Sequence, residues 1–464
     1  KEGKKDVVPI AHFSHKYMKK LLITGALGLT ASIVSAQKQP NIVYIFTDQH
    51  TANALSCTGN PDVKTPNIDR LAQNGIRFTN AYCACPLSTP SRAAMFTGVT
   101  PGKLKQLVNG SSIPQEYMGK GLGNLIQAAG YECAYSGKWH IPESDIPDSI
   151  HGFKKLYGHN DYGLSESCID FLKQKHDKPF FLVAAYDNPH NICEYARSQN
   201  LPFAEITEPN IEDCPNLPAN FAIAPYDADV IRQEQENNYK GYPVTRYTPD
   251  DWRRYRNAYY RLVENVDSEI GKLLDALDQL KLSENTLIIF TSDHGDGVGA
   301  HHWNQKSALY EEVTNIPLIV KLPKNKNAGK ITHQLINNGI DLLPTLCEFA
   351  NADIPDYCLG KSFKPIVEKI SDTPIHDYVV CETQFDNSTT KGWMVRTRNY
   401  KYIVYDKGKY REQLYDMNND RGEMINLAVE EKYKNILDQH RKLLNEWHEN
   451  NNVPKLKNAT PKIK

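Results

Sequence analysis

The sequence has almost no net charge, since 54 Lys and Arg stand against 55 Asp and Glu in 464 residues, a formal net charge of -1. A protein that neutralises several nucleic-acid phosphates needs a basic face, so we expect no nucleic-acid partner. The sequence also lacks internal repeats and low-complexity tracts. Its 40% hydrophobic and 23% charged residues exclude a collagen, a coiled coil and a disordered chain. This composition predicts a globular chain, long enough for two packed domains.

A long apolar run is missing as well. The apolar stretch 21–33 is shorter than the roughly 20 residues that cross a bilayer, so we expect no membrane span. Lys19 and Lys20 precede this stretch, and small residues ending at Ala36 follow it, a pattern typical of a cleavable secretory signal. We therefore assign residues 1–36 to upstream residues and a signal peptide, and predict a periplasmic or secreted protein. No Cys follows the predicted cleavage site, which argues against a lipid anchor.

Cysteine is sparse for an exported protein. Ten Cys in 464 residues are far fewer than a disulfide scaffold contains. The pairing of any that form disulfides cannot be read from the sequence.

Apolar runs of strand length alternate with helical patterns through most of the chain. Four of these runs, at 41–47, 131–136, 179–186 and 286–291, are almost continuously apolar, as strands buried on both faces are. A periodic apolar stripe from Thr248 to Leu277 predicts a long helix. The fold class is therefore predicted as α/β, with a large, mostly parallel central sheet flanked by helices.

The pattern changes after about Ile375, where short alternating runs precede a helix from about Glu430 to Trp447. This change predicts a catalytic domain at 37–374 and a smaller C-terminal α+β subdomain at 375–464. Between Glu194 and Thr248 the chain is polar and rich in Pro and Asn, which indicates a long surface excursion. Such an excursion can be a functional loop or a plain insertion, and both readings stay open.

Reactive side chains follow each of the four buried runs. The sequence places Asp48-Gln49 after the first run, Lys138 and His140 after the second, His190 after the third, and Asp293-His294 after the fourth. Ligands of open α/β sheets bind outside the carboxyl ends of the strands. We therefore expect all four segments to meet at one site.

Two of these segments contain candidate metal ligands. Asp48, Gln49, Asp293 and His294 offer two carboxylates, an amide oxygen and an imidazole. Oxygen-rich ligand sets favour Ca²⁺ or Mg²⁺. A single Asp at a strand end often caps a turn instead. Because an Asp recurs at two strand ends, a metal site is the favoured interpretation.

The segment from Ser88 to Gly98 predicts a short helix, with Pro90 at its first position and Gly98 as its C-terminal cap. Ser88 would then lie just before the positive end of the helix, where an anion is favoured. A plain helix start capped by Ser and Thr gives the same pattern.

Further cations and imidazoles complete the candidate site. This set suits an anionic ester such as a sulfate or a phosphate, with His available for proton transfer. A lone His is more often structural, and that alternative holds for each member taken singly. The set comprises Arg92, Lys138, Lys306, His140, His190 and His301.

Together these motifs resemble the formylglycine-dependent type I sulfatases of the alkaline phosphatase superfamily. The resemblance runs from about Pro40 to Ala428, and the order of its motifs makes it specific although each motif alone is weak. The motifs are Pro40-Asn-Ile-Val-Tyr-Ile-Phe-Thr-Asp48, Thr65-Pro-Asn-Ile-Asp-Arg-Leu-Ala72, Ser88-Thr-Pro-Ser-Arg92 with Thr97-Gly98, Gly137-Lys-Trp-His140, Pro189-His190, Thr291-Ser-Asp-His-Gly-Asp296, Lys306 with Tyr310-Glu311, and Leu414-Tyr-Asp416 with Asn426-Leu-Ala428.

The resemblance implies that a sulfatase-maturing enzyme oxidises Ser88 to formylglycine, whose hydrated aldehyde attacks the sulfur of a sulfate ester. Ser88 would also contact the metal. This makes the chain a Ser-type sulfatase, because neither Cys83 nor Cys85 stands before the x-Pro-Ser-Arg motif.

The resemblance also implies roles for the surrounding residues. Arg92 orients the aldehyde hydrate, and Lys138 and Lys306 hold sulfate oxygens. His190 donates a proton to the leaving alcohol, and His140 helps to release sulfate by deprotonating the second hydroxyl. His301 matches a His often found before the active-site Lys.

Two positions depart from the family pattern. The family commonly has paired acids where this chain has Asp48-Gln49, and often Asn where it has His294. Fewer carboxylates make the metal site less anionic and leave the identity of the metal open. We favour Ca²⁺ over Mg²⁺.

The favoured function is exo-acting desulfation of a sulfated carbohydrate, such as a glycosaminoglycan, a mucin or an algal glycan. Candidate substrate contacts are His159, Asp161, His301, Trp393 and Arg396, since His or Arg suits an acidic sugar and Trp stacks on a sugar ring. Each could equally support the fold. The alternatives are a phosphatase or phosphonate hydrolase on the same fold, which would use an unmodified Ser or Thr, and a non-catalytic glycan-binding protein.

Overall fold

The computed structural model describes residues 39–142, 148–203, 205–238 and 243–454. The predicted signal peptide at 1–36 lies outside these residues. Within the described part of the chain, every helix is too short or too polar to cross a bilayer.

The central element is an eight-stranded sheet with the strand order β4-β3-β5-β1-β6-β7-β2-β8. Strand β7 is antiparallel to β6 and β2, and every other neighbouring pair is parallel. The predicted mostly parallel sheet is thereby confirmed. Its strands are β1 (Asn41–Asp48), β2 (Ile76–Tyr82), β3 (Glu132–Gly137), β4 (Lys154–Tyr157), β5 (Phe180–Pro189), β6 (Thr286–Ser292), β7 (Leu318–Lys321) and β8 (Lys330–Asn337).

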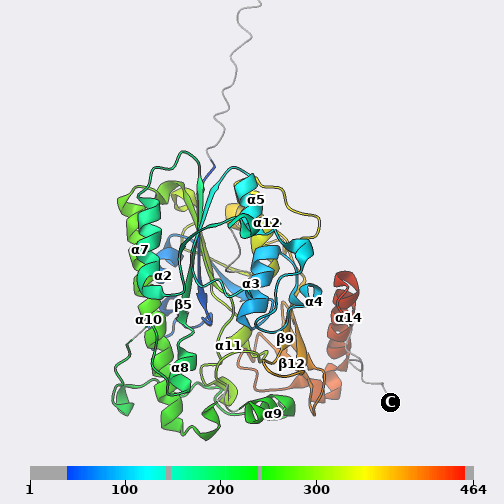
Figure 1. Cartoon of the computed structure of the whole chain (residues 1–464). Coiled ribbons are helices and arrows are strands. Elements are labelled where there is room, and N and C mark those ends of the chain that lie inside the picture. The colour runs from blue at the N-terminus through cyan, green and yellow to red at the C-terminus, as the bar shows by residue number, and fades with distance from the viewer. Residues whose placement is uncertain (1–38, 143–147, 204, 239–242, 455–464) are drawn as a thin grey trace, which may run out of the picture. The chain divides into compact units, whose positions relative to one another are not determined.

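Helices cover both faces of this sheet, as Figure 1 shows, with α2, α7 and α10 on one side and α3, α5 and α12 on the other. The helices are α2 (Pro66–Gln73), α3 (Ser88–Thr97), α4 (Pro101–Leu104), α5 (Leu122–Ala128), α6 (Asp148–His151), α7 (Asp161–Leu172), α8 (Ile192–Ala196), α9 (Asp229–Asn237), α10 (Pro249–Gln279), α11 (Glu311–Thr314), α12 (Asn338–Ala350), α13 (Lys364–Lys369) and α14 (Lys434–Asn451).

Strand β1 shows why its nearly continuous apolar run forms a central strand. Successive side chains of a strand point to opposite faces. Tyr44 and Phe46 pack in the core on the side of α3 and α5, whereas Val43 and Ile45 pack in the core on the side of α7 and α10. All four side chains are fully buried, so both layers of helices depend on this strand.

The long helix predicted from Thr248 is α10. Thr248 caps its start, because the Thr248 hydroxyl accepts a hydrogen bond from the Asp251 amide at 3.2 Å and the Asp251 carboxylate accepts one from the Thr248 amide at 2.8 Å. The excursion predicted at 194–248 contains the helix α9, which the sequence pattern did not reveal. Its mostly Gln, Glu and Asn residues include only two buried apolar side chains, Val230 and Ile231, too few for a clear period.

The C-terminal part contains a four-stranded antiparallel sheet with the order β12-β11-β10-β9. Trp393 of β10 belongs to the same core as Leu437, Leu444 and Trp447 of α14. The predicted α+β character of this part is confirmed, while the boundary at residue 375 stays a prediction. Its strands are β9 (Tyr378–Gln384), β10 (Lys391–Thr397), β11 (Tyr400–Tyr405) and β12 (Glu412–Asp416).

Strand order explains where the reactive side chains gather. Strands β3, β5, β1 and β6 are consecutive neighbours and run parallel to one another. Their carboxyl ends therefore lie along the same edge of the sheet, and each end leads into one of the four reactive segments. The expectation that these segments share one edge is correct.

Candidate active site

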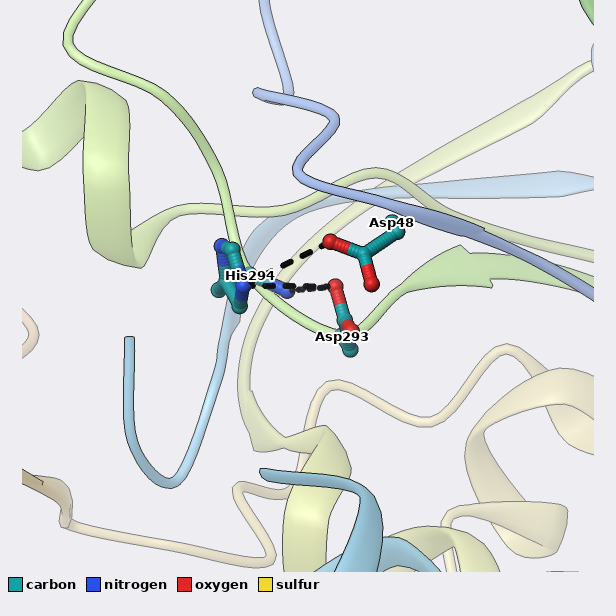
Figure 2. Close-up of side chains that lie close together, drawn as sticks. All are labelled: Asp48, Asp293 and His294. Carbon is teal, nitrogen blue, oxygen red and sulfur yellow. Dashed lines mark hydrogen bonds and ion pairs between the residues drawn. The ribbon is translucent and has the colours of Figure 1, made fainter. Parts of the chain in front are cut away.

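The centre of the site is a cluster of two carboxylates and an imidazole (Figure 2). Asp48 is the last residue of β1, and Asp293 and His294 follow β6 directly. The Nε2 atom of His294 lies 3.7 Å from Oδ1 of Asp48 and 3.8 Å from Oδ1 of Asp293. All three side chains are fully buried. Three potential metal ligands thus converge from two neighbouring strands.

Ser88 lies beside this cluster at the start of α3. Its Oγ lies 3.2 Å from both carboxylate oxygens of Asp48 and 3.0 Å from Nε2 of His294. Gly98 ends the helix in the left-handed conformation, at φ 70°, as the sequence predicts. The helix begins at Ser88, two residues earlier than predicted, so Ser88 belongs to the first turn. The hydroxyl therefore lies in the first turn of a helix, within hydrogen-bonding distance of one carboxylate and one imidazole.

Arg92 lies one turn further along α3 and bridges the two carboxylates. Its Nη2 lies 2.9 Å from Asp48 and its Nε lies 2.8 Å from Asp293. It also donates to the backbone oxygen of Lys138 at 2.6 Å. The guanidinium is fully buried, so its charge is compensated by these two acids.

Lys138, which follows β3, supplies the second cation. Its Nζ lies 2.7 Å from Oδ2 of Asp48 and 2.7 Å from Oδ1 of Asp187. Burial alone would raise the pKa of Asp48, but the charges of Lys138 and Arg92 outweigh it and hold this pKa well below its usual range. Asp48 is therefore ionised in the folded protein.

Asp187 is a member of this network that sequence reasoning missed. Its Oδ1 also lies 2.8 Å from Nε2 of His159, and its Oδ2 accepts a hydrogen bond from Asn191 at 3.0 Å. Asp161 orients this segment, because its carboxylate accepts from the backbone amides of Asp187 at 2.7 Å and of its neighbour at 2.8 Å. Asp187 lies in the carboxyl-terminal part of β5, so the rule of reactive strand ends could have found it.

His190 and Lys306 meet on the other side of the cluster. Nζ of Lys306 lies 3.1 Å from Nε2 of His190, so the ammonium donates to a neutral imidazole. Burial, followed by the charges of Lys138 and Lys306, lowers the pKa of His190 well below its usual value. His190 is therefore neutral at pH 7 in the free enzyme.

His140 occupies the open side of the site. Its backbone adopts the left-handed conformation, at φ 58°, and its carbonyl oxygen accepts a hydrogen bond from the Thr89 hydroxyl at 2.8 Å. Its side chain lines a cavity together with Lys138 and His159. Desolvation and then the charge of Lys138 lower the pKa of His140 to about 3.

Gln49 has other partners than the metal ligands in this structure. The side-chain nitrogen Nε2 of Gln49 donates to Oδ2 of Asp296 at 2.7 Å. The backbone amide of Gln49 donates to Oδ1 of Asp293 at 3.1 Å. Burial raises the pKa of Asp296 to about 6. The prediction that the Gln49 side chain binds a metal therefore stays a prediction, whereas Asp296 is a contact that sequence reasoning missed.

Three of the predicted substrate contacts, His301, Trp393 and Arg396, pack against residues outside the cluster described above. His301 stacks on Tyr310, with ring centroids 4.2 Å apart, and lies near the carboxylates of Glu312 and Glu423.

The other two contacts, Trp393 and Arg396, are both buried in the C-terminal part. The Trp393 ring packs against His448, and Arg396 donates to the Tyr82 hydroxyl at 2.8 Å. The prediction that Trp393 and Arg396 contact substrate stays a prediction, and the substrate contacts proposed below involve other residues.

Comparison with known proteins identifies this arrangement. Residues 40–352, more than half of the chain, match the sulfatase family model, and residues 299–450 match the model of the C-terminal region of N-sulphoglucosamine sulphohydrolase. The chain belongs to the sulfatase family, within the alkaline phosphatase superfamily. It is a sulfuric ester hydrolase.

The similarity extends over nearly the full length of individual relatives. The chain is 32% identical over 446 residues to the Delta 4,5-hexuronate-2-O-sulfatase of Bacteroides thetaiotaomicron, with 91% of each chain covered. It is 28% identical over 509 residues to the N-acetylglucosamine-6-O-sulfatase of the same organism, with 92% of this chain and 90% of the relative covered. A solved structure of a 2-O GAG sulfatase superposes with a TM-score of 0.79 at 31% identity and covers 89% of this chain and 93% of that chain.

Proposed function

We propose that this sulfatase removes sulfate from a sulfated carbohydrate, acting on the end of a glycan, with residue 88 as its nucleophile. The observation that carries the proposal is the position of the Ser88 hydroxyl, 3.0 Å from His294 and 3.2 Å from Asp48, at the edge where four strands end. The substrates in the printed names of two relatives, a hexuronate and N-acetylglucosamine, support a glycosaminoglycan-type sugar.

The proposed nucleophile requires a modification of Ser88. A sulfatase-maturing enzyme would recognise the Ser88-Thr-Pro-Ser-Arg92 segment and oxidise the hydroxyl carbon to formylglycine. The hydrated aldehyde supplies a hydroxyl that attacks sulfur and a second hydroxyl whose deprotonation releases sulfate. The predicted signal peptide favours a periplasmic or secreted enzyme.

The surrounding side chains have separate roles in the proposed reaction: sulfate binding, positioning of the nucleophile and proton transfer. Lys138 and Lys306 bind sulfate oxygens, and Arg92 holds the nucleophilic side chain in place from the next turn of α3. Cations arranged in advance around a developing negative charge stabilise a transition state without reorganisation. His140, on the open side, accepts the proton whose removal releases sulfate.

His190 is proposed to protonate the leaving oxygen of the sugar. Its neutral state in the free enzyme follows from burial and from the nearby charges of Lys138 and Lys306. A bound sulfate ester is an anion and compensates those cations, so it raises the pKa of His190. Substrate binding itself therefore supplies the condition for His190 to carry a proton.

A divalent cation fits the buried donor set. Asp48, Asp293 and His294 would hold it, with residue 88 and Gln49 completing the ligands. Carboxylate and amide oxygens with one imidazole, all buried at one point, form a donor set that favours Ca²⁺, with Mg²⁺ as the alternative. The cation would supply charge compensation for the nucleophilic side chain.

Mass spectrometry of the peptide that carries residue 88 tests the proposed function directly. In protein made by its native host, we expect this peptide to have lost the mass of two hydrogen atoms relative to serine. The peptide carrying Ser136, which lies outside this motif, serves as its internal control. An unmodified Ser88 in fully active native protein would contradict the proposal and favour direct Ser chemistry, as in a phosphatase.

Metal analysis tests the cation site. We expect bound Ca²⁺ by elemental analysis and a loss of activity on chelation that added Ca²⁺ restores. Asp293→Asn should weaken Ca²⁺ binding by at least roughly 10-fold, since even outer partners of metal ligands contribute that much. The exposed Asp275, replaced in the same way, is the control. Chelation that changes neither metal content nor activity would exclude the cation.

The role of His190 predicts a dependence on the leaving group. We expect His190→Ala to lower kcat for a sugar sulfate by roughly 100-fold or more, the usual contribution of general acid catalysis. An aryl sulfate, whose leaving oxygen needs no proton, should lose much less. Equal losses for the two substrates would argue that His190 only positions Lys306.

A further inference from the structure

A cavity of about 260 Å³ opens beside Lys138, on the open side of the site. Five of its lining side chains are basic, although His140 is neutral at pH 7, and none of its described lining residues is acidic. Such a wall attracts anions and repels cations. The basic lining residues are Lys138, His140, His151, Lys155 and His159.

Asp187 contacts one residue of the catalytic cluster and one residue of the cavity wall. Its Oδ1 lies 2.7 Å from Nζ of Lys138 and 2.8 Å from Nε2 of His159. One buried carboxylate oxygen thus holds a cation of the proposed sulfate site and an imidazole of the cavity wall. The His159 side chain remains 53% exposed, so it is held in place while it faces solvent.

Lys155 carries a positive charge that is available to a ligand. It lies on β4, one of the two edge strands of the large sheet, and is exposed. It forms no ion pair with any residue that the structure describes. Its neighbour Lys154 is also exposed, but it does not line the cavity, because successive side chains of a strand point to opposite faces. The two lysines therefore differ in orientation and not in chemistry.

We propose that this cavity binds a second anionic group of the substrate, a carboxylate or another sulfate, next to the sulfate ester that is cleaved. The proposal rests on the proposed function, desulfation of a carbohydrate, because Lys138 belongs to both the sulfate site and the cavity. The volume lies just below the roughly 300 Å³ at which small-molecule pockets begin, so it suits one substituted sugar and not a longer segment. Lys155 and His159 select for the second anion.

Two pairs of substrates test the proposal. The first pair is a 2-sulfated hexuronic acid and its methyl ester, which differ only in the carboxylate charge. The second pair is glucosamine 6-sulfate with and without an N-sulfate. For each pair we define the anion preference as kcat/KM for the more anionic member divided by kcat/KM for the other.

We expect wild-type protein to prefer the more anionic member of at least one pair. Lys155→Ala should lower that preference roughly 10-fold or more, the effect of losing a hydrogen bond between charged groups. Lys154→Ala should leave it unchanged, and thermal denaturation confirms that both variants fold. A fall confined to the first pair identifies a carboxylate, and a fall confined to the second pair identifies a sulfate.

Equal anion preferences in wild type, Lys155→Ala and Lys154→Ala would overturn the proposal. If the enzyme cleaves 4-nitrophenyl sulfate but none of the four sugars, their inhibition constants against that reaction supply the same ratios. Wild-type protein that cleaves neither the sugars nor 4-nitrophenyl sulfate would instead contradict the proposed function, so the two failures are distinct.

Discussion

Replacing Ser88 with Ala should reduce sulfate release by at least about 1,000-fold while the protein stays folded, since loss of a covalent nucleophile removes the route through which the other residues act. The loss should appear in kcat, because Lys138 and Lys306 still bind the sulfate group. Alanine also suits the first turn of a helix, so α3 should form as before. Steady-state kinetics and thermal denaturation measure the two effects.

Ser136→Ala provides the matched control for this variant. Ser136 is as fully buried as Ser88, but its hydroxyl pairs with Ser167 at 2.6 Å and contacts none of the clustered acids. We expect its activity to stay within a few fold of wild type. Retained turnover in Ser88→Ala would end the assignment of residue 88 as the nucleophile.

Replacing Arg92 with Ala should destabilise the protein by about 3–5 kcal/mol, because it leaves buried carboxylates without their partner. Arg92 contacts Asp48 at 2.9 Å and Asp293 at 2.8 Å, and all three side chains are fully buried. A bound divalent cation would compensate part of the lost charge. The decrease in the urea denaturation midpoint should therefore be larger in a chelating buffer than in excess Ca²⁺.

Arg70 offers a control with the same chemistry at the surface. It pairs with Asp275 at 2.7 Å, but its side chain is 38% exposed. Solvent screens such a pair, so Arg70→Ala should cost less than about 1 kcal/mol in either buffer. Equal small losses for the two variants would show that Arg92 does not compensate the buried acids.

The sequence alone predicts much of the arrangement around the site. Apolar runs predict β1 and β6, and the rule that ligands bind at the carboxyl ends of strands predicts that Asp48 and Asp293 lie close together. The pattern of Pro90 and Gly98 predicts a helix beginning near Ser88. These signals are readable because each depends on residues next to one another in the chain.

The contacts that sequence reasoning missed have a different origin. Asp187 joins Lys138 to His159, and its role depends on the lengths of three strands and on the segment that Asp161 orients. The burial of Trp393 and Arg396 likewise depends on how the second sheet packs against α14 and Tyr82. A single sequence does not show whether an aromatic or basic residue faces a sugar or a core.

Hydrophobic period and motif order are local properties of the chain, so they were sufficient to predict the α/β class, the parallel strands and the set of reactive residue types. The folded arrangement was needed to show which acid neutralises which cation, where the Gln49 amide points, and which of two adjacent lysines lines the cavity. Those outcomes depend on distances of a few ångströms between segments far apart in sequence. At that range, burial and Coulomb energy change steeply with position.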